Sequence, residues 1–197
     1  MRLILASQSP RRRELLRLFH IPFTVRSADI DETMDPNADP AAEVARVSRA
    51  KAEATPCLPE DVVIAADTIV VLEGRVLGKP ADEADAAQML TALSGREHQV
   101  MTGVTVLRDG RCWVHTEITD IRFRPLSERE IREYVATGEP MDKAGAYGIQ
   151  GGAALFAEHM VGDYYNVMGL PVCRLWQMLA QAAPELLEKP FSVEGMA

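Results

Sequence analysis

The run VVIAADTIVVL at residues 62–72 constrains the fold more than any other stretch of this chain. It is almost continuously apolar and rich in β-branched side chains, which is typical of a central strand covered on both faces. Its one charged residue is Asp67, and a carboxylate is costly to bury without a partner. We therefore expect Asp67 either to pair with a cation or to face a cleft, as a base or a metal ligand.

Strand and helix patterns are mixed on both sides of this run. The predicted strands are 2–6, 21–25, 99–108, 111–124 and 153–160, and the predicted helices are 9–20, 40–54, 82–93, 127–137 and 171–182. Asp109-Gly110 is a hairpin dipeptide, and Ser127 with Glu130 makes a capping box. The mixture predicts one α/β or α+β domain over residues 1–183, compatible with two lobes and a cleft, and a mobile C-terminal tail over residues 184–197.

The composition limits the partners and the compartment. Acidic residues outnumber basic ones by 29 to 21 and the formal charge is −8, so a broad nucleic-acid-binding face is not expected. Cys57, Cys112 and Cys173 are odd in number and form no CxxC pair, which favours a reducing compartment over disulfides or structural zinc. Without a signal-peptide pattern or an apolar run long enough for a membrane span, we expect a cytoplasmic protein with no membrane partner.

The stretch SQSPRRRELL contains an electrostatic conflict. Ser9 and Pro10 predict a helix start, yet Arg11–Arg13 then occupy the first turn, where the helix dipole repels cations. Arg13 and Arg17 add a like-charge pair four residues apart. A phosphate bound at the helix start would relieve both penalties, so the pattern favours an anion site. The alternative is a solvated face in which Arg11 pairs with Glu14.

Other polar side chains are candidates for a shared site. Glu32 and Asp142 are loop carboxylates that could converge on Asp67, and oxygen ligands of this kind suit Mg²⁺. Lys79 lies in GRVLGKP, which lacks the spacing and the Ser or Thr of a Walker A loop, so it is either a simple phosphate-binding lysine or a solvated one. Gln150, in GAYGIQGG, offers a donor and an acceptor suited to a base edge, or is a surface glutamine.

Several separated stretches together resemble one family, the Maf proteins, which are nucleoside triphosphate pyrophosphatases first named for an association with septum formation. The resemblance extends from about Leu3 to Leu179. It rests on the number and order of the motifs LASQSPRRRELL, DIDET, ADTIV, LGKP, SGREHQVMTGV, YVATGEPMDKAGAYGIQGG and NVMGLP.

This resemblance implies hydrolysis of a nucleoside triphosphate to the monophosphate and pyrophosphate, assisted by a divalent cation, Mg²⁺ first and Mn²⁺ or Co²⁺ as alternatives. It also implies the fold of the inosine triphosphate pyrophosphatases, a long mixed twisted sheet flanked by helices and divided into two lobes by a cleft, and a homodimer. Asp67 matches the family's proton acceptor, and the family's other cleft residues match Ser7, Arg12, Glu32, Lys51 and Lys79. We expect the catalytic set to be Asp67, Glu32 and Lys79, the metal ligands to be Glu32 and Asp67, and the phosphate contacts to be Ser7, Arg12, Lys51 and Lys79.

The base preference follows from three positions at which the branches of the family differ. Arg11, Thr68 and Gln150 resemble the branch that acts on dTTP and UTP, and a glutamine amide can pair with both N3–H and O4 of uracil or thymine. The alternatives are a 7-methyl-GTP pyrophosphatase of the same family and a nucleotide-binding regulator of cell division without required catalysis. Asp163 departs from the family pattern, where a small residue such as serine is expected.

Overall fold

The structure is a computed structural model, and it describes residues 1–188. Its core is one seven-stranded sheet in the order β2-β1-β3-β5-β6-β7, with β4 paired to β3. β1 is parallel to β2 and β3, and the other pairs are antiparallel, so the expected mixed sheet is confirmed. The strands are β1 (Leu3–Leu5), β2 (Phe23–Val25), β3 (Val62–Leu72), β4 (Arg75–Leu77), β5 (Glu97–Arg108), β6 (Arg111–Phe123) and β7 (Ala157–Val161).

Helices cover this sheet, and two of them begin at the caps that the sequence predicts, Ser9 and Ser127. Ser9, Asp39, Asp82 and Ser127 each accept a backbone N–H at a helix start, and Ser127 with Glu130 forms the expected capping box. No helix within residues 1–188 is long and apolar enough to cross a membrane. The helices are α1 (Pro10–Arg17), α2 (Pro40–Ala54), α3 (Glu83–Leu93), α4 (Glu128–Val135), α5 (Tyr164–Met168) and α6 (Val172–Ala182), with 3₁₀ turns at Glu139–Asp142, Ala144–Ala146, Gly152–Leu155 and Pro184–Leu187.

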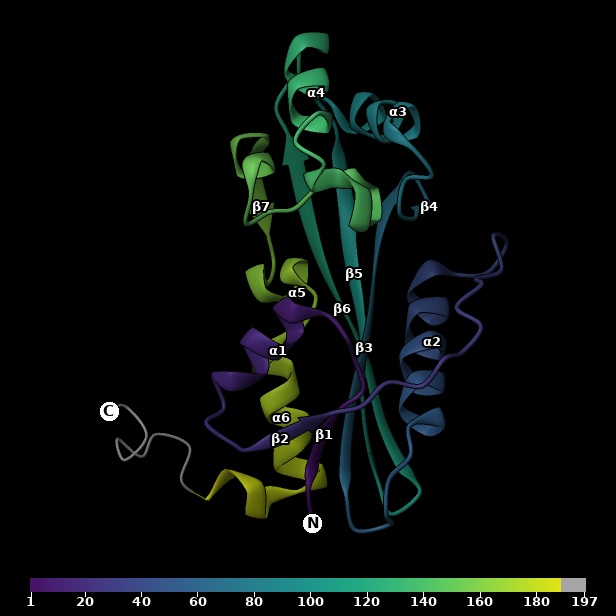
Figure 1. Cartoon of the computed structure of the whole chain (residues 1–197), viewed down its shortest axis with the longest axis vertical. Helices are drawn as coiled ribbons and strands as arrows, with labels where there is room; N and C mark the ends of the chain where they lie inside the picture. The colour runs from purple at the N-terminus through teal and green to yellow at the C-terminus, as the bar shows by residue number, and fades with distance from the viewer. Residues whose placement is uncertain (189–197) are drawn as a thin grey trace.

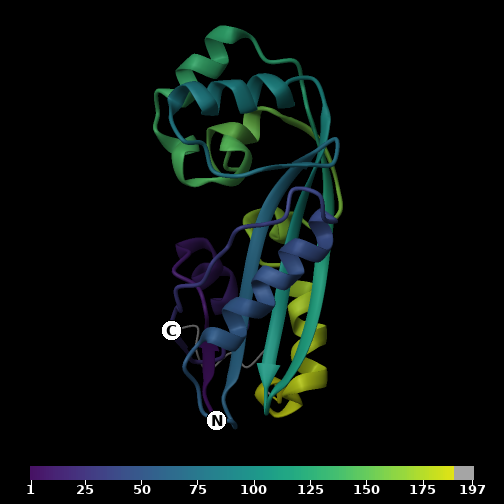
Figure 2. The same ribbon diagram turned by 90° about the vertical axis from the view of Figure 1, so that its right-hand side faces the viewer.

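Three long strands join two lobes. β3, β5 and β6 run from the lower lobe into the upper one, where α3, α4 and the three 3₁₀ turns between residues 139 and 155 pack around their ends (Figure 1). Figure 2 shows the upper lobe set apart from the helices of the lower lobe along the same strands. Each lobe has its own buried cluster, one built on α1, α6 and the lower part of β3, the other on α3, α4 and Val70 and Leu72 of β3.

The alternation of side chains along β3 determines which helix each residue meets. Val62, Ile64 and Ala66 pack in the cluster that contains α1 and α6, whereas Val63 and Ala65 pack in the cluster that contains α2. Helices α1 and α6 therefore cover one face of the strand and α2 covers the other, as the ribbon shows (Figure 1). Helices cover both faces, which explains why the run is almost entirely apolar.

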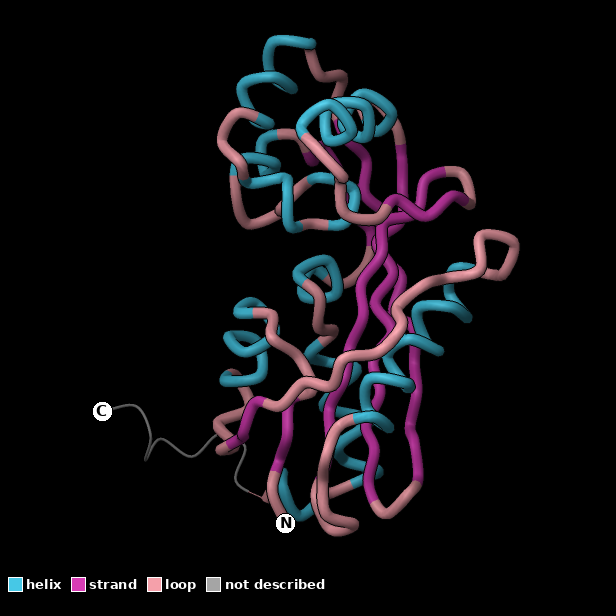
Figure 3. Tube along the Cα trace, turned by 45° about the vertical axis from the view of Figure 1, so that its right-hand side comes forward, coloured by secondary structure: helices cyan, strands magenta, loops and turns pink. Residues whose placement is uncertain are grey.

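The edge of β3 opposite β5 is interrupted in the middle of the molecule. β1 pairs with β3 only as far as Ile64, and β4 begins to pair at Val70. Among the described residues no strand pairs with this edge between Ile64 and Val70. Asp67 and Thr68 lie in this unpaired segment. The break lies between the lobes (Figure 3), and it lets Asp67, the one charged residue of the run, line a cleft while its backbone stays paired to β5.

Some predicted boundaries were wrong. The predicted strand 153–160 begins only at Ala157, because residues Gly152–Leu155 form a 3₁₀ turn, and short apolar runs carry no period that separates the two. The predicted tail began at residue 184, but Pro184–Leu187 is a 3₁₀ turn whose leucines pack against the lower core, and Glu185 pairs with Arg108 at 2.7 Å. The remainder of that tail, residues 189–197, lies outside the described residues.

A buried histidine makes the fold sensitive to acid. His98 is 2% exposed, and its Nε2 shares a hydrogen bond of 2.9 Å with the hydroxyl of Tyr147. Burial lowers the pKa of His98 from 6.5 to about 4. The folded protein therefore holds His98 neutral at a pH where the unfolded chain binds a proton.

We expect the free energy of unfolding to fall by up to about 3 kcal/mol from this residue alone as the pH drops from 6.5 towards 4. Chemical denaturation of the wild type and His98→Asn at about pH 7 and about pH 4.5 measures the effect. The wild type should lose more stability than the variant over this interval. Equal losses would show that His98 does not carry the acid sensitivity.

Candidate active site

All nine residues predicted for the site line one cleft of about 990 Å³ between the lobes. This volume lies at the upper end of the roughly 300–1,000 Å³ common for small-molecule sites. The lower lobe supplies the segment before α1, the end of α2 and the middle of β3, and the upper lobe supplies the glycine-rich loop after α4. The nine are Ser7, Arg11, Arg12, Glu32, Lys51, Asp67, Thr68, Lys79 and Gln150.

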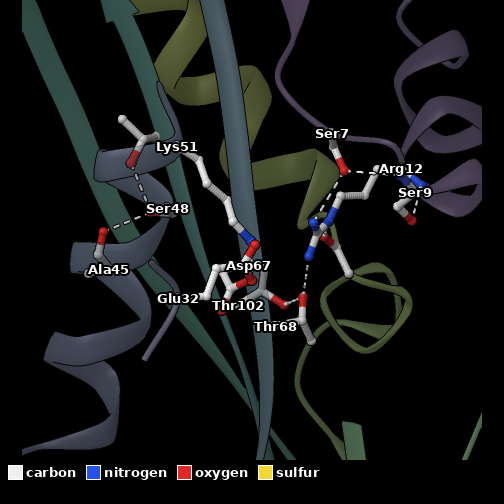
Figure 4. A network of polar contacts seen from close by, with 12 residues as sticks. Ser7, Ser9, Arg12, Glu32, Ala45, Ser48, Lys51, Asp67, Thr68 and Thr102 are labelled. Atoms are coloured by element: carbon white, nitrogen blue, oxygen red, sulfur yellow. Dashed lines mark hydrogen bonds and ion pairs between the residues drawn. The ribbon is translucent and has the colours of Figure 1, made fainter. Parts of the chain in front are cut away.

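Lys51 joins the two predicted metal ligands. Its Nζ lies 2.7 Å from Asp67 Oδ1 and 2.8 Å from Glu32 Oε2, and Figure 4 shows the ammonium between the two carboxylates. Lys51 reaches this position because α2 lies directly on β5 at Gly103, where an added Cβ would come within 2.3 Å of the Val44 carbonyl oxygen. The ammonium predicted to bind phosphate is thus paired with carboxylates, and it also lines the cleft.

The same pair of carboxylates is the place where a divalent cation fits. Because Glu32 and Asp67 both lie within ion-pair distance of one Nζ, their oxygens can approach a single cation. Among residues 1–188 no group of three or more His, Cys, Asp or Glu side chains could hold a metal by itself. Two carboxylates completed by substrate phosphates and water are the usual arrangement for Mg²⁺, so these residues fit the predicted ion.

Asp142 does not join this pair. It lines the same cleft, but its Oδ1 lies 2.6 Å from the Nζ of the adjacent Lys143. This contact lowers the pKa of Asp142, and the charge of Arg11 acts in the same direction. The predicted convergence on Asp67 is therefore confirmed for Glu32 and wrong for Asp142, because a neighbouring lysine holds the latter in the upper lobe.

Arg12 is the arginine that enters the site. Its Nη1 donates to Ser7 Oγ at 3.3 Å, its Nη2 to Thr68 Oγ1 at 3.0 Å and its Nε to the Gly169 carbonyl at 2.8 Å (Figure 4). Burial lowers the pKa of the guanidinium and Asp67 opposes this shift, but a guanidinium stays charged at neutral pH. Of its five N–H groups two remain for a ligand, and the Ser7 hydroxyl keeps its own hydrogen to donate.

Two further cations line the cleft, and a third does not. Within the described part of the chain, Arg11 and Lys79 form no ion pair or side-chain hydrogen bond, so both can meet an anion. Arg13 was expected to join them, and this was wrong. It lies with Arg17 in a separate surface depression and donates to the Gln8 carbonyl at 3.0 Å, because successive helix positions point about 100° apart.

Gln150 extends into the cleft from a loop that two upper-lobe side chains hold. The Tyr134 hydroxyl accepts from Gly148 N at 3.1 Å and donates to Glu139, whose other oxygen accepts from Gly152 N at 3.1 Å. Gln150 itself is exposed, and no hydrogen bond of its amide occurs within residues 1–188. Sequence reasoning gave Tyr134 and Glu139 no role, although both lie in a motif that carried the resemblance.

The departure from the family pattern at Asp163 is structurally conservative. Its side chain accepts from Tyr165 N at 2.8 Å and caps the start of α5. Serine and aspartate are both favoured at this position of a helix. The Asp163 residue therefore serves the helix that carries the Gly169 carbonyl, and it does not alter the cleft.

The chain is similar to several known proteins. The protein named dTTP/UTP pyrophosphatase from Symbiobacterium thermophilum is 55% identical to this chain, and the match covers 91% of this chain and 93% of that protein. The protein of the same name from Halalkalibacterium halodurans is 52% identical, and the match covers 87% of this chain and 91% of that protein. A solved HAM1 protein from Coxiella burnetii shares the fold, with a TM-score of 0.50 and 16% identity over 92% of this chain and all of its own. The family model described as Maf-like protein matches residues 2–182, and this chain therefore belongs to the Maf family.

Proposed function

We propose that this protein is a pyrophosphatase that hydrolyses dTTP and UTP to the monophosphate and pyrophosphate. The observation that carries the proposal is the cleft itself, which opposes Arg11, Arg12 and Lys79 to the carboxylates of Asp67 and Glu32. Three cations suit a triphosphate, and a carboxylate beside them suits a water nucleophile. The two relatives that carry this activity in their names are similar over most of the chain.

The reaction needs few groups. Water attacks the α-phosphorus, Asp67 accepts the proton that the water loses, and the bond to the bridging oxygen breaks as pyrophosphate leaves. Arg12 and Lys79 neutralise the charge that grows on the leaving group, and the Ser7 hydroxyl donates to a phosphate oxygen. Such transfers depend mainly on position and on charge stabilisation, which a partly enclosed cleft makes stronger.

Glu32 and Asp67 would hold Mg²⁺, with Mn²⁺ or Co²⁺ as alternatives. The ion, when bound, neutralises phosphate charge and orients the substrate. A cation held by both carboxylates would also release Lys51 from its two ion pairs, so that its ammonium can turn to a phosphate. This exchange reconciles the predicted phosphate role of Lys51 with its pairing in the structure.

Gln150 would select the base. Its free amide offers one acceptor and two donors, which match N3–H and O4 of uracil or thymine. Thr68 and Arg11 are the other two predicted selectivity positions, and they lie on the lower-lobe side of the cleft. A glutamate in place of Gln150 would lose the donors and favour a cationic base such as 7-methylguanine.

The direct test is pyrophosphate release from a panel of canonical and modified nucleoside triphosphates with Mg²⁺. Fast release from dTTP and UTP, with little from purines, is expected for the wild type. Gln150→Glu should lower kcat/KM for dTTP by at least about tenfold, as expected for a lost base contact, while changing the unfolding midpoint little. Wild-type activity confined to 7-methyl-GTP would contradict the base assignment. The absence of pyrophosphate release from every nucleotide tested would favour a nucleotide-binding regulator of cell division.

The proposal also covers the oligomeric state and the cellular compartment. We infer a homodimer from the family resemblance, and sedimentation velocity would count the subunits. The free cysteines support a cytoplasmic, reducing compartment. The family resemblance implies an enzyme that removes non-standard nucleotides before they are incorporated.

A further inference from the structure

A buried hydroxyl lies behind the site, where no predicted residue had been placed. Thr102 is on β5 directly opposite Thr68 on β3, and it is fully buried. The two hydroxyl oxygens are 2.9 Å apart, and Figure 4 shows Thr102 next to Thr68 and beyond it the guanidinium of Arg12. Thr102 does not line the cleft. Any effect of this hydroxyl on the reaction must therefore act through the groups it contacts, the Thr68 hydroxyl and the Asn166 carbonyl.

The direction of these hydrogen bonds can be worked out from the atoms. The Thr102 hydroxyl donates to the Asn166 carbonyl at 3.0 Å, and a carbonyl only accepts. Since a hydroxyl has one hydrogen, Thr68 must donate to Thr102. The Thr68 oxygen then accepts from Arg12 Nη2 at 3.0 Å. Every donor points the same way, from the guanidinium through two hydroxyls to a backbone carbonyl.

The residue at the far end of this series of hydrogen bonds, Asn166, is held by further contacts. Asn166 is fully buried, and its amide donates to the Val100 carbonyl at 3.0 Å and to Thr119 Oγ1 at 2.9 Å. Its helix, α5, ends at Gly169, whose carbonyl accepts directly from Arg12 Nε at 2.8 Å. Arg12 is thus tied to one short helix at two places, directly at its C-cap residue Gly169 and through two threonines at Asn166 in its middle.

We propose that Thr102 is a positioning residue for Arg12. It takes the only hydrogen of the Thr68 hydroxyl, so that Thr68 presents a lone pair to the guanidinium and orients the two N–H groups that remain for phosphate. Thr68 then influences the reaction by holding Arg12, because its hydroxyl hydrogen is not available to a base. This inference rests on the proposed role of Arg12 in binding the triphosphate.

The chain offers a matched control on the same strand. Thr105 is also fully buried, and its hydroxyl lies 2.8 Å from Ser48 Oγ, on the side of β5 that faces α2. Thr102→Val and Thr105→Val each remove one buried hydroxyl and should lower the unfolding midpoint to a similar extent. Only Thr102→Val disturbs a contact that leads to Arg12.

The test is steady-state hydrolysis of dTTP by both variants at a temperature where both are fully folded. For Thr102→Val we expect kcat/KM to fall about tenfold, less than the roughly hundredfold that a 1 Å misplacement can cost, with a clear rise in KM. Partial unfolding would lower kcat and leave KM unchanged. Thr102→Ser, which restores the hydroxyl, should recover the wild-type KM, and Thr105→Val should keep it throughout.

A double-mutant cycle separates this inference from the function on which it rests. If Thr102 acts through Arg12, Thr102→Val should cost little more once Arg12→Lys has been made. A full tenfold loss in both backgrounds, or a Thr102→Val enzyme that matches Thr105→Val, would overturn the positioning role alone. An Arg12→Lys enzyme with unchanged kcat/KM would instead overturn the phosphate role of Arg12.

Discussion

Replacing Asp67 with asparagine is expected to lower kcat for dTTP by about 10²–10⁴-fold, the usual contribution of a general base. Asparagine keeps the shape of the side chain and cannot take a proton from the attacking water. The fold should survive, because Glu32 still pairs with Lys51 at 2.8 Å and Asp67 lies at the break in the edge of β3. Pyrophosphate release and the thermal unfolding midpoint, measured on the same sample, test both parts.

Asp120→Asn is the matched control. Asp120 lies on β6 and accepts from the Gln99 amide at 2.9 Å, away from the residues that line the cleft. It should retain wild-type kcat. An Asp67→Asn enzyme with full kcat would show that another group takes the proton. A variant that lost hydrolysis but preserved an effect on cell division would point to a regulatory role.

Arg12→Lys is the second variant with a large expected effect. Lysine keeps the positive charge, but one ammonium cannot replace a fork that reaches Ser7, Thr68 and Gly169 and still presents two N–H groups. We expect kcat/KM to fall by about 10²–10³-fold, as for other lost donors to a developing charge. Arg12→Ala should also lose about 1–3 kcal/mol of stability, because buried acceptors are left without a donor.

The neighbouring arginine provides the control for this variant. Arg13→Lys makes the same change one residue further along α1, on a side chain that lies outside the cleft. It should leave kcat/KM unchanged. Equal losses from Arg12→Lys and Arg13→Lys would mean that the general charge of the helix start, and not the geometry of one guanidinium, binds the triphosphate.

The elements that the sequence predicted best are those with strong local signals. The bounds of β3 and α2 were correct to the residue, since one is a nearly continuous β-branched and apolar run and the other begins with proline and is rich in helix formers. The break in the β3 edge was not predictable. It depends on where β1 ends and β4 begins, and strand pairing is a long-range property that no local pattern records.

The chemistry of the site divides in the same way. The sequence by itself determined which residue types are unusual in their places: a carboxylate inside a buried strand, arginines at the start of a helix and a glutamine among glycines. Only the tertiary structure decided that Arg12 enters the cleft while Arg13 leaves it, that Lys51 pairs with Glu32 and Asp67, and that Thr102 supports Arg12 from behind. The physical reason is that burial, partners and the direction of each hydrogen bond belong to atoms brought together from distant segments, and these become neighbours only when the sheet has formed.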